Sequence, residues 1–373
     1  MCYAHSMGKF GVGLDIGTTT IQAQLVNLKT GGTLDTFSAF NNQRSFGADV
    51  ISRISASKGG KITKLFSVVN NQVKDILEYF IKKNKLDNIE KCVVSGNTTM
   101  LHFFCCIDPV DMGSAPYTPA FLEEQYFDGK DLFLPVKNIT LLPGISAFVG
   151  ADITAGLALI DIMNKGKDAL FVDIGTNGEM AVWKESEKQL LCCSAAAGPC
   201  FEEMETSCGL NASEFIDVAA EMKRSNVIDE TGVMTKEFLQ TGYPAREGSV
   251  VTQKDVRQFQ LAKSAIFSGI KMICKKADLG AGGFGAVYIA GGLGLHLNLE
   301  NAAAVRLLPK EFAGRPQELQ IEVCGNTSLK GAVKCLTDSE FLPRCREISS
   351  RAETIDLAND KYFSAAFEHN MWF

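Results

Sequence analysis

The sequence predicts an α/β protein with two lobes that are built on the same β-hairpin plan. Two observations lead to this fold class. First, 373 residues exceed what one hydrophobic core usually supports. Second, one strand-and-turn pattern occurs twice, as Asp15-Ile-Gly-Thr and as Asp173-Ile-Gly-Thr. We therefore expect a first lobe at residues 8–150, a second lobe at 151–335, and a C-terminal segment at 336–373 that packs on the lobes.

Each copy of the repeat begins with an apolar run that indicates a buried strand, and this strand turns at a glycine. A second strand is predicted at residues 21–28 in the first copy and at 179–183 in the second. A third strand follows at residues 33–40 and at 189–194. The two lobes are therefore expected to share one three-stranded hairpin arrangement.

Amphipathic helices are predicted in the intervals between these strands. The apolar side chains of residues 65–80 recur at helical spacing, and residues 49–54 open another helix. Thr252 is a predicted N-cap for a long helix. After that helix, the apolar run at residues 286–290 indicates a buried strand that ends at Gly291-Gly-Leu-Gly.

Composition limits the classes of partner. Hydrophobic residues make up 46% and charged residues 21%, as in ordinary soluble globular proteins. The net charge of −6 and the lack of a basic stripe argue against nucleic acid as a partner. The apolar run around residues 157–162 is much shorter than the ~20 residues that span a bilayer, so no membrane association is expected. Because the N-terminus lacks the features of a secretory signal, we expect a cytoplasmic protein.

The two repeated turns are suited to phosphate binding. Glycine and threonine expose backbone N–H groups and hydroxyls without bulk, so phosphate oxygens can approach closely. Asp15 and Asp173 end the preceding strands and are predicted to hold hydrated Mg²⁺ through water. The predicted phosphate-binding residues are Gly17, Thr18, Thr19 and Thr20 in the first turn and Gly175, Thr176, Asn177 and Gly178 in the second.

A third glycine-rich turn is predicted to contact the nucleoside. Gly291, Gly292 and Gly294 follow a buried strand and would let the backbone lie flat against a base and ribose. The GxGxxG match at residues 280–285 lies after a helix and before a strand, which is the reverse of the dinucleotide-binding context. No GxxxxGK[ST] motif is present, so P-loop chemistry is excluded.

The twelve cysteines are scattered rather than grouped. Ferredoxin-type spacings and CxxC pairs are absent, so no built-in iron–sulfur cluster is expected. Cys200 and Cys208 flank a glycine-rich turn, where they are either reduced thiols or contributors to a cluster shared between subunits. His102 lies in an apolar helix, where a core position is favoured over a role as an axial cobalt ligand.

These elements, in this order, resemble the actin, sugar-kinase and heat-shock-chaperone superfamily. The resemblance implies two RNase-H-like, actin-like ATPase lobes with ATP between them and hinge closure as the working motion. It also implies that Asp152 positions the attacking water, although an Asp there could instead be a helix N-cap. The matching segments are Asp15–Thr20, Gly150–Ala155, Asp173–Gly178, Gly291–Gly294 and the second connecting helix Gly325-Asn-Thr-Ser-Leu-Lys-Gly-Ala.

Longer strings resemble the ATPase half of the reductive activators of corrinoid proteins, over almost the whole chain from about Gly11. They include Phe46-Gly-Ala-Asp-Val-Ile-Ser-Arg-Ile, Gly96-Asn-Thr-Thr-Met-Leu-His, Ala115-Pro-Tyr-Thr-Pro, Leu142-Pro-Gly-Ile-Ser-Ala-Phe-Val-Gly-Ala-Asp, Ser194-Ala-Ala-Ala-Gly-Pro, Ser207-Cys-Gly, Thr252-Gln-Lys-Asp and Ile355-Asp-Leu-Ala.

This resemblance implies an ATP-hydrolysing enzyme that helps to reduce the Co(II) of a corrinoid protein to Co(I), and it implies a homodimer. Such activators usually carry a plant-type ferredoxin domain in front, which this sequence lacks, so a separate ferredoxin-like donor is expected. Cys200 also stands where the pattern has a small residue.

Two other functions remain open on the same fold. One is a small-molecule kinase in which Asp152 or Asp173 is the base for a substrate hydroxyl. The other is a nucleotide-gated binding module without enzymatic turnover. Substrate-independent ATP turnover that a protein stimulates would distinguish the activator from both.

Overall fold

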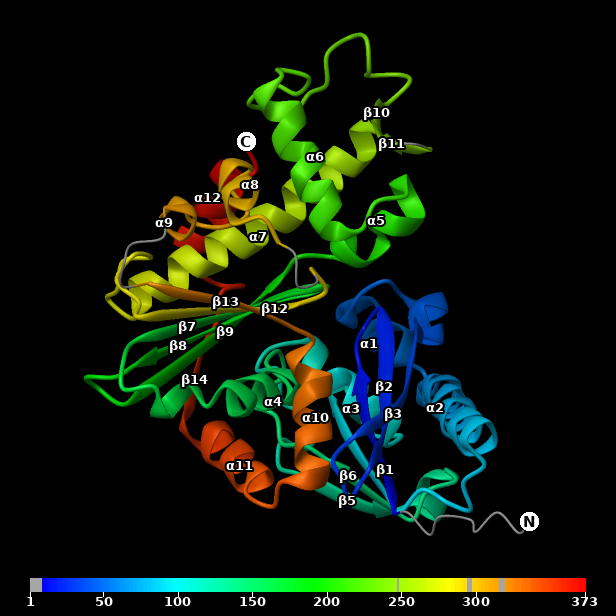
Figure 1. Ribbon diagram of the computed structural model, residues 1–373. Helices are drawn as coiled ribbons and strands as arrows, with labels where there is room; N and C mark the ends of the chain where they lie inside the picture. The colour runs from blue at the N-terminus through cyan, green and yellow to red at the C-terminus, as the bar shows by residue number, and fades with distance from the viewer. Residues whose placement is uncertain (1–8, 247, 294–296, 315–318) are drawn as a thin grey trace. The chain divides into compact units, whose positions relative to one another are not determined.

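The computed structural model describes residues 9–246, 248–293, 297–314 and 319–373. These residues form two compact units (Figure 1). Unit 1 comprises the described residues of Met1–Ile160 and Thr327–Ser350, and unit 2 comprises those of Asp161–Asn326 and Arg351–Phe373. The predicted fold class, two lobes of mixed α/β structure, is confirmed.

Unit 1 contains a six-stranded sheet in the order β3-β2-β1-β4-β6-β5. The first three strands are antiparallel, β4 and β6 run parallel to β1, and β5 is antiparallel to β6. Buried Val12, Leu14 and Ile16 explain why β1 lies in the middle of the sheet. The strands are β1 (Phe10–Ile16), β2 (Thr20–Asn27), β3 (Thr33–Phe40), β4 (Lys91–Gly96), β5 (Gln125–Asp128) and β6 (Asn138–Leu141).

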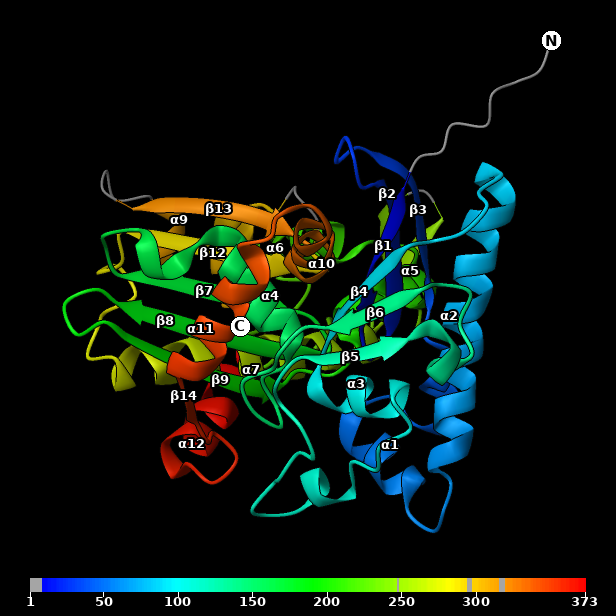
Figure 2. The ribbon, with the colours of Figure 1, turned by 90° about the horizontal axis from the view of Figure 1, so that it is seen from below.

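Helices cover both faces of the unit 1 sheet. Figures 1 and 2 show α2 and α3 on one face and α4 and α10 on the other. The apolar stripe of α2 is buried, as its periodicity predicts. The helices are η1 (Asn42–Phe46), α1 (Val50–Ser57), α2 (Ile62–Asn84), α3 (Thr98–Phe104), η2 (Val110–Gly113), η3 (Gly129–Leu132), α4 (Ala151–Ile160), α10 (Thr327–Thr337) and α11 (Phe341–Arg351), where η marks short 3-10 helices and Arg351 already belongs to unit 2.

Unit 2 repeats the plan of unit 1. Its sheet has the order β13-β12-β7-β8-β9-β14, so that β9-β8-β7-β12-β13 corresponds to β3-β2-β1-β4-β6. The strand directions correspond as well, and β14 adds a parallel strand beside β9. The strands are β7 (Ala169–Ile174), β8 (Asn177–Lys184), β9 (Gln189–Ala196), β10 (Tyr243–Arg246), β11 (Ser249–Val251), β12 (Ala286–Gly291), β13 (Gln320–Gly325) and β14 (Ala352–Ile355), of which β10 and β11 pair only with each other.

The long helix α7 lies across the unit 2 sheet, with α8, α9 and α12 on the same side (Figure 1). Thr252 is its N-cap, as predicted, and Asp255 completes a capping box with it. The helices are η4 (Ile162–Asn164), α5 (Cys200–Cys208), α6 (Ala212–Arg224), α7 (Gln253–Lys276), α8 (Leu299–Ala304), α9 (Lys310–Ala313) and α12 (Lys361–Asn370).

The boundaries of the units differ from the predicted division at residues 150 and 335. Both α4 and α10, which that division places in the second lobe, belong to unit 1, where α10 packs on β1 and β4. The segment after Arg351 belongs to unit 2. There β14 pairs with β9, and buried Lys263 of α7 donates hydrogen bonds from Nζ to the carbonyl oxygens of Asn370 and Trp372, at 2.8 and 2.7 Å.

Candidate functional site

The first predicted phosphate turn joins β1 to β2 in unit 1. The N–H of Gly17 donates to the carbonyl oxygen of Thr20 at 3.0 Å, which closes the turn. Asn41 Nδ2 donates to the carbonyl oxygen of Gly17 at 2.9 Å, and Asn97 Nδ2 donates to Thr18 Oγ1 at 2.8 Å. Neighbouring amide side chains therefore hold the shape of this turn.

The threonines of the first turn differ in burial. Thr18 and Thr19 are buried, whereas Thr20 at the start of β2 is half-buried. The predicted contribution of Thr18 and Thr19 to phosphate binding thus rests on their backbone N–H groups more than on their hydroxyls. These assignments stay predictions.

An acidic pair lies beside this turn. Asp15 is the next-to-last residue of β1, and its Oδ1 accepts a hydrogen bond from Ser328 Oγ of α10 at 2.7 Å. Ser328 Oγ also lies 2.9 Å from Ser95 Oγ of β4. The second carboxyl group belongs to Asp152, the second residue of α4. Unit 1 therefore brings the predicted metal-binding and water-positioning aspartates together.

The surroundings of Asp152 shift its pKa. The pKa of Asp152 is raised to about 7, chiefly by burial and in addition by the negative charge of Asp15. The backbone N–H groups of Gly150, Asp152 and Ile153 act in the opposite direction, and that of Ile153 donates to Asp152 Oδ1 at 2.9 Å. Because Asp152 titrates near neutral pH, it can accept a proton from water or orient it. It lies inside α4 rather than at the N-cap position.

Small residues let α10 approach the rest of unit 1 closely. A Cβ atom on Gly331 would lie 2.7 Å from Ala155 Cβ and 2.9 Å from the Ala155 carbonyl oxygen on α4. A Cβ on Gly13 of β1 would lie 2.6 Å from a methyl group of Val333. This tight packing places Ser328 against Asp15.

The second predicted phosphate turn joins β7 to β8 in unit 2. The N–H of Gly175 donates to the carbonyl oxygen of Asn177 at 3.0 Å, two residues further on, whereas the first turn closes three residues further on. The carbonyl oxygen of Thr176 accepts from the N–H groups of Ala197 and Gly198 at 3.2 and 2.8 Å. Gly178, the last predicted residue of this turn, is buried against Ile266 of α7.

Glu202 contacts this turn, although the sequence did not predict it as a site residue. It belongs to α5, and its carboxylate accepts from the Thr176 N–H at 3.2 Å and from Thr176 Oγ1 at 2.6 Å. The signal was its position just after the string that starts at Ser194. The Glu202 carboxylate thus occupies the two donors of Thr176, and phosphate binding by this turn stays a prediction.

The predicted adenosine turn begins at the end of β12. Gly291 has φ +101°, and a Cβ there would lie 2.2 Å from the Ile174 carbonyl oxygen and 2.7 Å from Asp173 Oδ1. The turn therefore requires glycine and sits beside the carboxylate of Asp173. Gly292 is exposed, and the predicted residue Gly294 lies outside the described residues.

Each unit offers one of the two predicted Mg²⁺ ligands. Asp15 and Asp173 each end a central strand and offer the carboxylate oxygens that this ion prefers. Among the described residues, no group of three or more His, Cys, Asp or Glu side chains could hold a metal ion by itself.

Cys200, Cys208 and His102 are buried. Cys200 and Cys208, at the two ends of α5, are buried free thiols, and burial raises the pKa of both. His102 is buried as predicted, with Nδ1 2.7 Å from the Thr98 carbonyl oxygen and Nε2 accepting from the Ala120 N–H at 3.1 Å. Both of its ring nitrogens are thus engaged. Along the described segments, no helix is both long and apolar enough to cross a bilayer.

Comparison with known families covers nearly the whole chain. The model of the RACo middle region matches residues 10–165, and the model of the C-terminal domain of RACo, the ASKHA domain, matches residues 167–216 and 212–373. The chain belongs to the RACo family. The resemblance that the sequence motifs predicted is therefore confirmed.

Individual relatives agree with this family. The chain is 28% identical to the corrinoid activation enzyme RamQ of Eubacterium limosum, over 98% of the chain and 70% of the relative. It is 26% identical to the [Co(II) methylated amine-specific corrinoid protein] reductase of Methanosarcina barkeri, over 55% of the chain and 39% of that protein. A solved reductive activator for corrinoid, iron-sulfur protein superposes with a TM-score of 0.89 at 29% identity, over 99% of the chain and 67% of that structure.

Proposed function

We propose that this RACo-family chain hydrolyses ATP and couples that hydrolysis to the reductive activation of a corrinoid protein, from Co(II) to Co(I). The observation that carries the proposal is the acidic pair of Asp15 and Asp152 beside a glycine turn, together with a second glycine turn after the corresponding strand of unit 2. The names of the relatives, two of which are a corrinoid activation enzyme and a corrinoid-protein reductase, supply the partner class.

Different residues have different proposed roles in ATP hydrolysis. We assign phosphate binding to the Gly17–Thr20 and Gly175–Gly178 turns, and nucleoside contact to Gly291 and Gly292. Asp152 positions the attacking water, since its raised pKa lets it exchange a proton near pH 7. Mg²⁺, held near Asp15 and Asp173, would neutralise the charge of the phosphates.

ATP is needed because the reduction is unfavourable. A one-electron transfer loses a factor of ten in its equilibrium constant for each ~59 mV of unfavourable potential gap. An ATP-dependent change in how the activator binds its partner can offset that gap. We propose that a separate ferredoxin-like protein supplies the electron and that the activator works as a cytoplasmic homodimer.

The test is an anaerobic assay of the purified chain with MgATP, a reduced ferredoxin and corrinoid proteins from the same cell. We expect one corrinoid protein to raise the rate of ATP hydrolysis and to show the Co(I) absorption spectrum only when ATP is present. The Thr176→Val variant should lose both effects. ATP turnover that no protein stimulates, or Co(I) formation that is independent of ATP, would exclude the proposal.

A further inference from the structure

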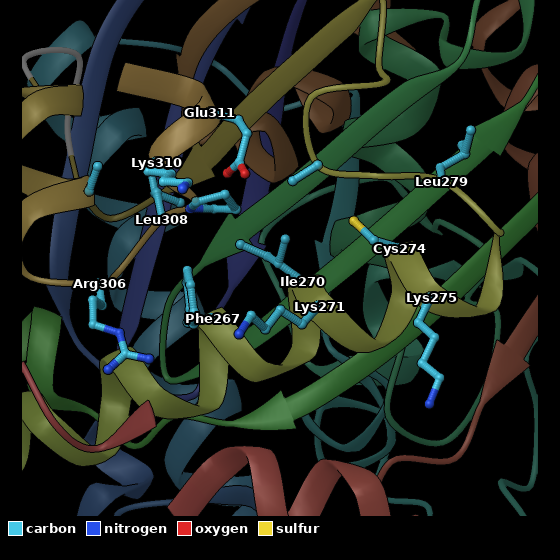
Figure 3. A pocket seen from close by; sticks show the side chains of 13 residues that line it. Phe267, Ile270, Lys271, Cys274, Lys275, Leu279, Arg306, Leu308, Lys310 and Glu311 are labelled. Atoms are coloured by element: carbon cyan, nitrogen blue, oxygen red, sulfur yellow. The ribbon is translucent and has the colours of Figure 1, made fainter. Parts of the chain in front are cut away.

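A separate hollow of about 450 Å³ lies in unit 2 (Figure 3). It is lined by the C-terminal half of α7, by the segment that precedes β12, and by residues from the end of α8 to the start of α9. Leu279 and Ala281 of this lining precede the first residue of β12, whereas Gly291 is its last. The hollow is therefore at the opposite end of β12 from the predicted adenosine turn.

The floor of the hollow is apolar. Buried Phe267 and Ile270 of α7 and buried Leu308 form part of it, and Cys274 adds a thiol whose pKa burial raises to about 12. The volume falls within the ~300–1,000 Å³ range of small-molecule sites. Burial of an apolar ligand surface here would favour binding, because that surface leaves water.

Cationic side chains surround this floor although the whole chain has a net charge of −6. Lys271, Arg306 and Lys310 line the hollow together with one carboxylate, that of Glu311, which leaves a local surplus of positive charge. The fourth lining cation, Lys275, points away in Figure 3 and has its Nζ 4.0 Å from the centre of the Tyr362 ring.

These three cations have no acidic partner of their own. In the described part of the chain, none of Lys271, Arg306 and Lys310 forms an ion pair within 4.0 Å. Arg306 donates instead to the neutral Oδ1 of Asn370 at 3.0 Å. Its charge also adds to burial in lowering the pKa of Lys263, so the surroundings of Arg306 favour an added negative charge.

We propose that this hollow binds a small amphipathic anion, with the apolar body of the ligand on the floor and its acidic group at Lys271, Arg306 and Lys310. Charge-assisted hydrogen bonds to a guanidinium and two ammonium groups fix the acidic end, and the Glu311 carboxylate disfavours a second negative charge on its side of the hollow. The site is independent of ATP binding and does not rest on the proposed function.

The test uses two fluorescent probes that differ in one charge. 8-Anilinonaphthalene-1-sulfonate carries a sulfonate, and N-phenyl-1-naphthylamine has the same rings without it. We expect the sulfonate probe to bind one site per chain about tenfold more tightly than the neutral probe. Saturating MgATP should not displace it. Equal affinity for both probes, or displacement by MgATP, would overturn the proposal.

Paired variants separate charge from general effects. Lys271→Gln with Lys310→Gln removes two exposed cations of the hollow, and Lys61→Gln with Lys64→Gln removes two exposed cations of unit 1. We expect the first pair to weaken sulfonate-probe binding about fivefold or more while leaving neutral-probe binding unchanged. The second pair should change neither. If both pairs weaken sulfonate binding alike, the hollow is not the site.

The Ala303→Leu variant tests the hollow by filling it with a larger side chain. It should weaken the binding of both probes, and unchanged binding in this variant would also contradict the proposal.

Discussion

Replacing Asp152 by Asn should stabilise unit 1 while it slows ATP hydrolysis. Asn has nearly the same shape and can still accept the hydrogen bond from the Ile153 N–H. It carries no charge beside Asp15. The variant therefore removes the electrostatic cost of the acidic pair and, at the same time, the group that we assign to positioning water.

The size of the effect follows from the pKa of Asp152, which is raised from 3.8 to about 7. In this window the folded chain holds a proton that the unfolded chain has lost, so the stability of the parent falls as pH rises from 3.8 to 7. At about 1.36 kcal/mol per pKa unit, the cost is roughly 4 kcal/mol at pH 8 and roughly 1.7 kcal/mol at pH 5. The variant lacks this cost.

The assay is urea unfolding of the parent and Asp152→Asn at pH 5 and pH 8. We expect the gain in unfolding free energy of the variant to be roughly 2–3 kcal/mol larger at pH 8 than at pH 5. ATP turnover should fall about tenfold or more while MgATP affinity is retained. Asp87→Asn, at an exposed position of the same unit, is the matched control and should show neither change. A stability gain that is the same at both pH values would refute the reasoning.

Three further predictions concern other parts of the structure. Gly331→Val should lower the free energy of unfolding by about 3 kcal/mol, because its side chain would overlap Ala155; unchanged urea unfolding would contradict this. Lys263→Met should remove the rise in the free energy of unfolding that the parent shows between pH 7 and 10. The pKa of Lys263 is lowered to about 7, so the unfolded chain holds the extra proton up to pH 10.5, and the parent should gain roughly 4 kcal/mol between pH 7 and 10 that the variant does not. Thr176→Val should weaken MgATP binding about tenfold in calorimetry, with Thr241→Val, at an exposed position, as the control; equal affinity in both variants would remove Thr176 from the site.

Much of the local structure could be predicted because it depends on neighbouring residues. The strand β3 has the predicted bounds Thr33–Phe40, and Thr252 caps α7 as its position before an amphipathic run indicates. The repeated Asp-Ile-Gly-Thr turns occupy equivalent positions in the two sheets. Periodicity, capping and turn chemistry act over a few residues, so a single sequence is enough to recognise them.

The contacts that complete the candidate site could not be predicted in the same way. Ser328 donates a hydrogen bond to Asp15, which lies 313 positions earlier in the chain. Glu202 accepts a hydrogen bond from Thr176 but belongs to α5, which follows β8 and β9. Neither residue has a local pattern that names its partner. The placement of α10 in unit 1 likewise follows from packing on β1 rather than from the order of the chain.

The sequence by itself therefore determined the family, the duplicated α/β plan and the identity of the turns, because these are properties of motifs and short-range spacing. Tertiary structure alone decided the pairing of Asp15 with Asp152, the carboxylate at the Thr176 donors and the cationic hollow of unit 2. The physical reason is that charge, burial and close packing depend on which distant segments share space, and that choice is made only when the whole chain buries its apolar surface.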